Sequence, residues 1–239
     1  MELFLIRHAE STNNIRKNES DRVSDPELTQ RGLLQRTHMM NFFKKGLHLT
    51  NIERNSDEKF LDHLYCSAMQ RALQTTQPLG ESIKLKPEVW LEIHEVGGLY
   101  DVNSVGGSKL FCSGLKREEI NSGFPGYILP PKLTDQGWWN SDEETMRDAH
   151  LRVKKVIQQL TERETEKSRI GMVTHGAFMS LFFSILFKLQ PSKNMMFQHY
   201  NSSISRISFK KNNKIIIQYL NSFEYLPEDL RIPRPDFDI

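Results

Sequence analysis

The chain has 239 residues, enough for one domain with a sizeable buried core. Its 32 basic and 30 acidic residues give a formal net charge of +2, which is too balanced to indicate a nucleic-acid or membrane-surface protein. Two cysteines do not make a disulfide framework, so we expect a reducing, cytoplasmic location. The N-terminal apolar run meets Arg7 at once, unlike a secretory signal, and the most apolar segment, residues 177–187, is too short to span a bilayer.

Strands and helices alternate in the first hundred residues. The predicted strands cover residues 2–7, 60–67 and 88–95. A predicted helix covers residues 28–46, with Thr29 as its N-cap and Gly46 at its end. A second predicted helix covers residues 68–80 and ends near Pro78 and Gly80.

Between residues 97 and 142 the chain is rich in paired glycines, prolines and aromatics. This composition is typical of irregular structure, and we expect one short helix there, over residues 115–121. Regular elements return after it: a helix over residues 144–160, a strand from Ser168, an apolar helix over 177–187, and a closing hairpin of strands over 203–209 and 214–220. This alternation predicts an α/β fold, with a mostly parallel central sheet flanked by helices on both faces.

Charged and polar side chains follow the predicted strands at their carboxyl ends. The first strand ends in Arg7 and His8, and the strand from Ser168 ends just before His175. The strand over residues 60–67 leads into a helix whose first turn carries Arg71, and the next strand ends in Glu95. Because ligands bind beyond the carboxyl ends of the strands in an open α/β sheet, we expect these side chains to gather at one site.

This set of side chains is suited to a phosphoryl group. A neutral imidazole can attack phosphorus, while two guanidiniums and a second, protonated histidine can hold the equatorial oxygens. A protonated carboxyl group can donate the proton that a leaving alkoxide needs. No metal is required, and the sequence shows no spacing typical of a metal site. A lone Arg-His pair is usually a surface feature, so the coincidence of several strand ends carries this interpretation.

Six segments match the motifs of a known family in the family's order. "LIRHAESTNN" resembles R-H-G-E-S-x-x-N, and "DPELTQRG" resembles D-x-x-L-T-x-x-G. "YCSAMQRALQTT" resembles S-x-x-x-R-A-x-Q-T, and "VTHGAF" resembles the late T-H-G element. "NSSISRISF" and "YLNSFEYL" resemble the closing strands. From about residue 2 to 226 the chain thus resembles the histidine phosphatase superfamily, the phosphoglycerate-mutase-like proteins. Ala9 stands where glycine is usual, which adds a methyl group beside the candidate nucleophile.

The resemblance implies a role for each matching residue. His8 is the nucleophile that becomes phosphohistidine. Arg7, Arg71 and His175 form the phosphate pocket, and Asn14 contacts the phosphate or the entrance of its pocket.

The family also has an acidic proton donor, a glutamate soon after the third strand. Two glutamates in "WLEIHEVGGLYD" fit, Glu92 and Glu95. A strand alternates its faces, so these two side chains would point in opposite directions. Glu95 lies closer to the strand end and to the glycines, and we prefer it as the acid.

The function implied by the resemblance is that of a metal-independent phosphomonoester hydrolase, a histidine acid phosphatase. It would act through a phosphohistidine intermediate on a small phosphorylated metabolite, with no cofactor. A phosphoglycerate-mutase-type phosphotransferase is the alternative, and a catalytically weak binding protein of the same fold is a third. "EVGGLYD" lacks the arginine that mutases have after the acid, and its glycines suggest an open, flexible entrance, which favours hydrolysis.

We expect a single histidine-phosphatase-like domain over residues 1–239, in which residues 97–142 form a substrate-capping insertion. The expected partner is the small phosphorylated substrate. The sequence has no basic stripe or stacking motif for nucleic acid, and no segment for a membrane. A homodimer is left open.

Overall fold

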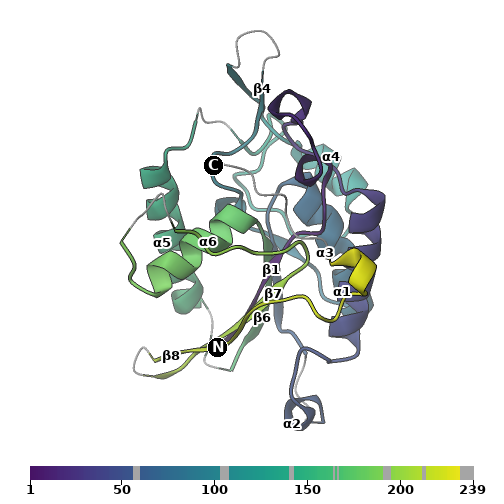
Figure 1. Ribbon diagram of the computed structural model, residues 1–239, viewed down its shortest axis with the longest axis vertical. Coiled ribbons are helices and arrows are strands. Elements are labelled where there is room, and N and C mark those ends of the chain that lie inside the picture. Colours follow the sequence, from purple (N-terminus) through teal and green to yellow (C-terminus); the bar gives the residue numbers. More distant parts are fainter. Residues whose placement is uncertain are drawn as a thin grey trace.

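The structure is a computed structural model, which describes residues 1–55, 60–102, 108–139, 143–163, 165, 167–190, 195–211 and 214–231. Six strands form the central sheet, in the order β3-β2-β6-β1-β7-β8 (Figure 1). Their bounds are Glu2–Arg7 (β1), His63–Cys66 (β2), Glu88–Val89 (β3), Arg169–Thr174 (β6), Ile204–Phe209 (β7) and Ile215–Ser222 (β8). The strands β3, β2, β6 and β1 are parallel, whereas β7 pairs antiparallel with both β1 and β8. The predicted α/β fold and the closing hairpin are confirmed.

Helices cover both faces of this sheet (Figure 1). On one side lie α1 (Gln30–Lys44) and α3 (Gln70–Ile83), which pack against each other. On the other side lie α5 (Met146–Arg163) and α6 (Gly176–Leu186). Among the described residues, no helix is long and apolar enough to cross a membrane.

The alternation of β1 explains why helices are needed on both faces. Phe4 and Ile6 belong to the apolar core that the sheet shares with α1 and α3. Leu3 and Leu5, which point the other way, belong to the core shared with α5 and α6. All four side chains are fully buried, so β1 is one of the two central strands of a sheet covered on both sides.

The first helix starts and ends where its sequence predicts. The Thr29 hydroxyl accepts a hydrogen bond from Gly32 N at 3.0 Å, as an N-cap does, and Gly46 follows the helix at a φ of +66°. Gly32 lies against the backbone of Glu10, where an added Cβ would come within 2.1 Å of the carbonyl oxygen. Glycine at this position therefore lets α1 pack on the loop that follows His8.

The helix α3 continues past Pro78 to Ile83, three residues beyond Gly80, whereas the sequence predicts an end near Pro78 and Gly80. A proline inside a helix leaves the carbonyl four residues earlier without its usual donor. Here that carbonyl belongs to Gln74, and it accepts a hydrogen bond from Arg36 of α1 at 2.7 Å. The neighbouring helix thus satisfies the group that the proline leaves unpaired, and α3 does not need to stop.

The strand predicted over residues 88–95 is wrong beyond Val89. Trp90 N still donates a hydrogen bond to Cys66 O of β2 at 2.9 Å. The chain then forms a 3₁₀ helix, η3 (Leu91–Ile93). Three residues per turn place Trp90 and Ile93 on one side, and both are buried in the core beside α5 and α6. Burial of these two side chains overrides the strand pattern.

The described part of the 97–142 segment is more regular than predicted. It contains a small antiparallel sheet of β4 (Tyr100–Val102) and β5 (Lys109–Phe111), seen at the top of Figure 1. The helix α4 (Arg117–Gly123) starts two residues later than predicted. Residues 103–107 and 140–142 lie outside the described residues, and so does the tail after Arg231.

Short elements complete the description. They are η1 (Thr12–Asn14), η2 (Glu19–Asp21), α2 (Asn51–Arg54) and η5 (Glu228–Leu230). Of these, η1 and η2 belong to the loop between β1 and α1, which follows His8 directly.

Candidate active site

Three neighbouring parallel strands bring the predicted side chains together. At the carboxyl end of β1 lies His8, whose backbone N donates to Thr174 O at 2.9 Å. His175 follows β6 directly and is the N-cap residue of α6. The strand β2 leads through Ser67 into α3, whose second residue is Arg71. Because β1, β6 and β2 are adjacent and parallel, these residues meet at one edge of the sheet.

The hydrogen bonds of His8 fix the position of its ring proton. Its Nδ1 lies 2.7 Å from Ala9 O, which can only accept a hydrogen bond, so Nδ1 is the protonated nitrogen. At the other side of the ring, Arg71 Nε donates to His8 Nε2 at 3.1 Å. Nε2 therefore carries the lone pair, and this is the atom that can act as a nucleophile. The side chain is buried, with 2% of its surface exposed.

Arg71 lies at the start of α3, close to the carboxyl group of Asp25. The Oδ1 atom of Asp25 accepts a hydrogen bond from Gln70 N at 2.9 Å, at the first residue of α3. Burial raises the pKa of Asp25 to about 6, although the charge of Arg71 opposes this rise. Asp25 was not identified as a candidate, although it opens the quoted "DPELTQRG" segment.

Arg7 is the last residue of β1, directly before His8, and is buried, with 2% of its surface exposed. Its Nη1 donates to His199 O at 2.5 Å, and its backbone N donates to Ser203 O at 3.0 Å, both in the approach to β7. A Cβ added to Gly176 would lie 3.3 Å from Arg7 Nε, so the guanidinium packs closely against the start of α6. This places a fixed positive charge between β1 and β6.

His175 is fully buried, and its ring lies 5.1 Å from the ring of His8 between centroids. Its Nε2 is 2.8 Å from Ser67 Oγ. Burial and the charges of Arg71 and Arg7 hold the pKa of His175 well below its ordinary value. Both influences favour the neutral imidazole in the protein without ligand, whereas the sequence analysis expects a protonated second histidine.

Glu95 lies against the N-terminus of α6. Its Oε1 accepts hydrogen bonds from the backbone N of Val96 and of Phe178, each at 3.0 Å. Its Oε2 accepts one from Ala177 N at 3.3 Å. The carboxyl group is thus anchored beside the turn that carries His175.

Glu92 does not reach this turn. It lies on η3, is partly exposed, and pairs with Lys132 at 3.8 Å between Oε1 and Nζ. The two glutamates do not alternate across a strand as predicted, because η3 replaces the strand here. Of the two candidates, the structure brings Glu95 to the other site residues.

A buried ion pair between Arg152 and Glu144 lies next to the loop that carries Glu95, and the sequence analysis did not predict it. The guanidinium of Arg152, on α5, binds both carboxylate oxygens of Glu144 at 2.6 and 2.7 Å. It also donates to Glu92 O and His94 O, at 2.7 and 3.1 Å. This pairing lowers the pKa of Glu144 to about 2, although burial opposes it. Arg152 therefore ties α5 to the loop that carries Glu95.

Asn14 holds the backbone around His8. Its Oδ1 accepts hydrogen bonds from Ser11 N and Ser11 Oγ, both at 3.0 Å, and from Asn201 Nδ2 at 3.1 Å. Asn201 Nδ2 also lies within 3.2 Å of His8 O. Asn201 was not predicted, although it begins the quoted "NSSISRISF" segment, and it links the antiparallel half of the sheet to the site.

The alanine in place of the usual glycine fits without strain. Ala9 is fully buried and is not among the residues of positive φ, so no left-handed backbone is needed. Its backbone N donates to Thr75 Oγ1 of α3 at 3.0 Å. The methyl group therefore leaves the turn after His8 intact.

Two glycines come soon after Glu95 in the chain. Gly97 and Gly98 both have positive φ, and Gly97 N donates to Glu144 at 3.2 Å. A Cβ added to Gly98 would lie 2.1 Å from Trp139, so the indole ring packs directly on this glycine. Positive φ accounts for both glycines and close packing accounts for Gly98, while the open, flexible entrance expected from the sequence stays a prediction.

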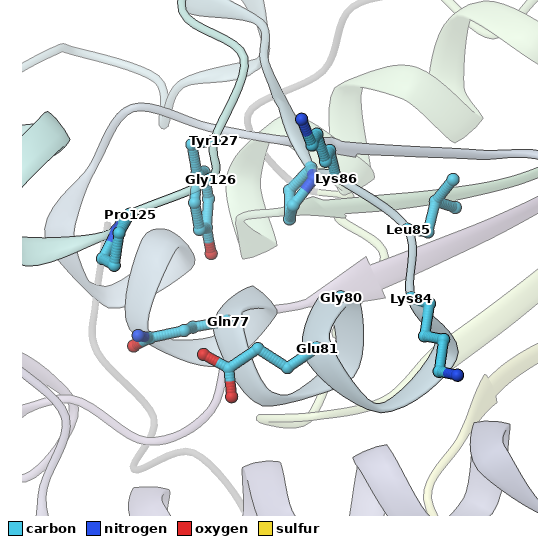
Figure 2. Close-up of a pocket in the computed structure, with 10 residues that line it drawn as sticks. Gln77, Gly80, Glu81, Lys84, Leu85, Lys86, Pro125, Gly126 and Tyr127 are labelled. Carbon is cyan, nitrogen blue, oxygen red and sulfur yellow. The ribbon is translucent and has the colours of Figure 1, made fainter.

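A groove of about 280 Å³ lies elsewhere, between the C-terminal half of α3 and the turn at Pro125 (Figure 2). Figure 2 shows Gln77 and Glu81 of α3 facing Tyr127 across it. Ten helix positions separate Arg71 from Glu81, which is roughly 15 Å along the axis at 1.5 Å per residue. None of the residues that line the groove belongs to the cluster around His8.

Within the described residues, no group of three or more His, Cys, Asp or Glu side chains is placed to hold a metal ion.

A comparison with curated protein sequences finds no significant match for this chain. The model of the histidine phosphatase superfamily, branch 1, matches residues 3–222.

Solved structures with the same fold cover nearly the whole chain. The mycobacterial glucosyl-3-phosphoglycerate phosphatase complexed with VO₃ is 19% identical, with a TM-score of 0.60 over 93% of this chain and 99% of that chain. The Entamoeba histolytica phosphoserine phosphatase in complex with 3-phosphoglyceric acid is 18% identical, with a TM-score of 0.58 over 95% and 99%. The Shigella flexneri α-ribazole phosphatase is 17% identical, with a TM-score of 0.62 over 93% and 96%. At these identities the likeness shows a shared fold, and the match over residues 3–222 shows that the chain belongs to the histidine phosphatase superfamily.

Proposed function

We propose that this protein is a metal-independent phosphomonoesterase that transfers the phosphoryl group of a small metabolite to His8 and then to water. The observation that carries the proposal is the state of His8. Its Nδ1 proton is held by Ala9 O, and its Nε2 lone pair faces the guanidinium of Arg71. A nucleophilic nitrogen thus lies beside a cation that can hold the oxygens of the phosphoryl group.

The first half of the reaction is an in-line displacement on phosphorus. His8 Nε2 forms the new N–P bond while the bond from phosphorus to the leaving oxygen breaks. Arg71 and the buried Arg7 stabilise the charge on the equatorial oxygens. Glu95, anchored beside the His175 turn, is the group we assign to protonate the leaving oxygen.

In the second half, water attacks the phosphohistidine and His8 leaves with its lone pair restored. Glu95, now ionised, accepts the proton of the attacking water, which returns both groups to their starting state. Three solved structures of the same fold carry phosphatase names, which favours hydrolysis over transfer to a second hydroxyl group. The described part of the 97–142 segment, with Tyr100 and the β4–β5 sheet, is assigned to capping the substrate.

The test is hydrolysis of p-nitrophenyl phosphate and 3-phosphoglycerate in the presence of a chelator. We expect release of inorganic phosphate by the wild type and none by His8→Ala. His63→Ala is the matched control, because His63 lies at the opposite, amino end of β2 and is partly exposed. Activity that needs an added divalent ion contradicts the proposal. Interconversion of 2- and 3-phosphoglycerate that outpaces phosphate release assigns the protein to the mutases instead.

A further inference from the structure

Ser67 has no role in the mechanism so far, yet it lies in the centre of the site. It follows β2 directly, its side chain is fully buried, and its backbone N donates to Val173 O at 3.1 Å. Its Oγ lies 2.8 Å from Nε2 of His175. Both groups are therefore fixed by the strands that carry them, and the remaining question is which of the two donates the proton.

Counting donors and acceptors answers this question. The Ser67 hydroxyl already accepts a hydrogen bond from Met69 N at 3.3 Å, and it has one proton of its own to donate. Within the described residues, His175 Nε2 is its acceptor. The opposite arrangement, with Nε2–H donating to Ser67, would leave the buried hydroxyl proton without an acceptor, which is costly. Ser67 is therefore the donor, and His175 Nε2 carries the lone pair.

The proton of the neutral His175 ring then lies on Nδ1. This atom is buried and has no hydrogen-bond partner within the described residues. A buried N–H group without an acceptor is unfavourable unless a ligand supplies the acceptor. The ring of His175 lies 5.1 Å from the ring of His8, measured between centroids. In the proposed function, His8 is the residue that receives the phosphoryl group. An oxygen of that phosphoryl group is the acceptor that fits.

We propose that Ser67 is a positioning residue that holds neutral His175 in its Nδ1–H tautomer, so that Nδ1–H donates a hydrogen bond to the transferring phosphoryl group. The inference rests on the proposed function, since it takes the phosphoryl group at His8 as the acceptor. Arg7 and Arg71 supply the positive charge of the pocket, and His175 adds a directed donor without adding a third charge.

The first test needs no variant. Long-range ¹H–¹⁵N spectra of the wild-type protein, labelled in histidine, report which ring nitrogen carries the proton. At neutral pH and without ligand we expect His175 to show a protonated Nδ1 and an unprotonated Nε2. A protonated Nε2 with an unprotonated Nδ1, or two protonated nitrogens, would overturn the proposal.

The second test removes the donor. Ser67→Ala takes away the hydroxyl, whereas Ser67→Thr keeps it, and Ser82→Ala on α3 is the matched control for loss of a serine hydroxyl. Vanadate is the probe, because it mimics the phosphoryl group and needs no turnover. We expect Ser67→Ala to weaken vanadate binding about 10–100-fold, the equivalent of one hydrogen bond to a charged group. We expect Ser67→Thr to restore most of this affinity and Ser82→Ala to change it less than about twofold.

The spectra separate positioning from general damage to the fold. If Ser67→Ala binds vanadate weakly and His175 now populates the Nε2–H tautomer, the proposal holds. If the tautomer and the vanadate affinity both stay as in the wild type, the proposal is wrong. Vanadate binding also separates this inference from the proposed function. A protein that forms no phosphohistidine but shows these vanadate effects would refute the assigned activity while supporting the role of Ser67.

Discussion

At the carboxyl edge of the sheet, His8 and His175 follow two strands and Arg71 begins a helix, so backbone pairing holds the site together. The described part of the 97–142 segment has only a short two-stranded sheet and isolated backbone hydrogen bonds, such as those from Trp138 N and Trp139 N to Ser113 O, and it relies in addition on the packing of side chains. Trp139 packs on Gly98, and the indole of Trp138 lies close to Gly114, where an added Cβ would clash. The contrast separates two tasks. Strand ends fix the residues of the candidate site, whereas the irregular segment, to which we assign the capping of the substrate, depends on its own close packing.

The same contrast explains which elements of the fold could be predicted from the sequence. The strands and helices around His8 follow regular apolar patterns, so their positions and the residues at their ends could be predicted. The β4–β5 pair could not, because its three-residue strands, Tyr100–Val102 and Lys109–Phe111, are too short to show a pattern. The role of Gly98 depends on Trp139, which lies far away in the sequence.

Within the site, prediction failed where a role depends on hydrogen bonds. Ser67 and Asn201 lie in segments that match the family, but only their contacts to His175 and to His8 show what they do. The charge expected for His175 rests on residue type, whereas burial beside two arginines lowers the pKa of this ring. Neither burial nor proton position can be read from residue type alone.

The largest expected effect comes from the edge of the sheet. Arg71→Ala removes the cation next to the nucleophile, and we expect kcat/KM for p-nitrophenyl phosphate to fall roughly 10²–10³-fold. Arg147→Ala, an exposed arginine on α5, is the control and should leave activity within about twofold. A loss of less than tenfold in Arg71→Ala would show that this guanidinium does not act on the transition state.

The next effect tests the acid. Glu95→Gln should lower kcat roughly 10²-fold on an alkyl phosphate, whose leaving oxygen needs a proton, and much less on an aryl phosphate. Glu92→Gln should change neither rate, because its side chain pairs with Lys132 away from the His175 turn. The reverse pattern, with Glu92→Gln slow and Glu95→Gln active, would move the assignment to Glu92.

Substitutions of glycines in the 97–142 segment should change the stability of the protein. Gly98→Ala places a Cβ at a φ of +75° and 2.1 Å from Trp139, so we expect the free energy of unfolding to fall by about 2–3 kcal/mol. Gly123→Ala is the matched control, since nothing lies within 4 Å of its Cβ, and it should be neutral or slightly stabilising. Urea unfolding measures both. Equal stability of the two variants would contradict the packing described for Gly98.

A smaller effect comes from pH and lies away from both regions. Burial among Phe4, Phe43 and Phe60 lowers the pKa of His48 to about 4, so the folded protein keeps this ring neutral while the unfolded chain protonates it below about 6.5. The unfolded state then binds more protons than the folded state. As the pH is lowered from about 6 to about 4.5, this residue should therefore decrease the free energy of unfolding by about 1.4 kcal/mol per pH unit. Asp25 opposes this trend, because its pKa is raised to about 6 and it takes up a proton on folding.

His48→Phe removes the titrating group and keeps an aromatic ring in the pocket. We expect the pH dependence of its unfolding free energy to be shallower than that of the wild type by about 1.4 kcal/mol per unit in the same window. Parallel curves for the two proteins would show that His48 does not titrate as described.

The central claim is that His8 Nε2 receives the phosphoryl group, and trapping this intermediate tests it most directly. Wild-type protein is mixed with excess p-nitrophenyl phosphate, quenched in alkali within the first turnovers, digested and sequenced by mass spectrometry. We predict a phosphate on His8 that survives alkali and is lost in acid, as the N–P bond of a phosphohistidine requires, and no adduct in His8→Ala. An acid-stable phosphate on Ser11, or an adduct that persists in His8→Ala, would contradict the account.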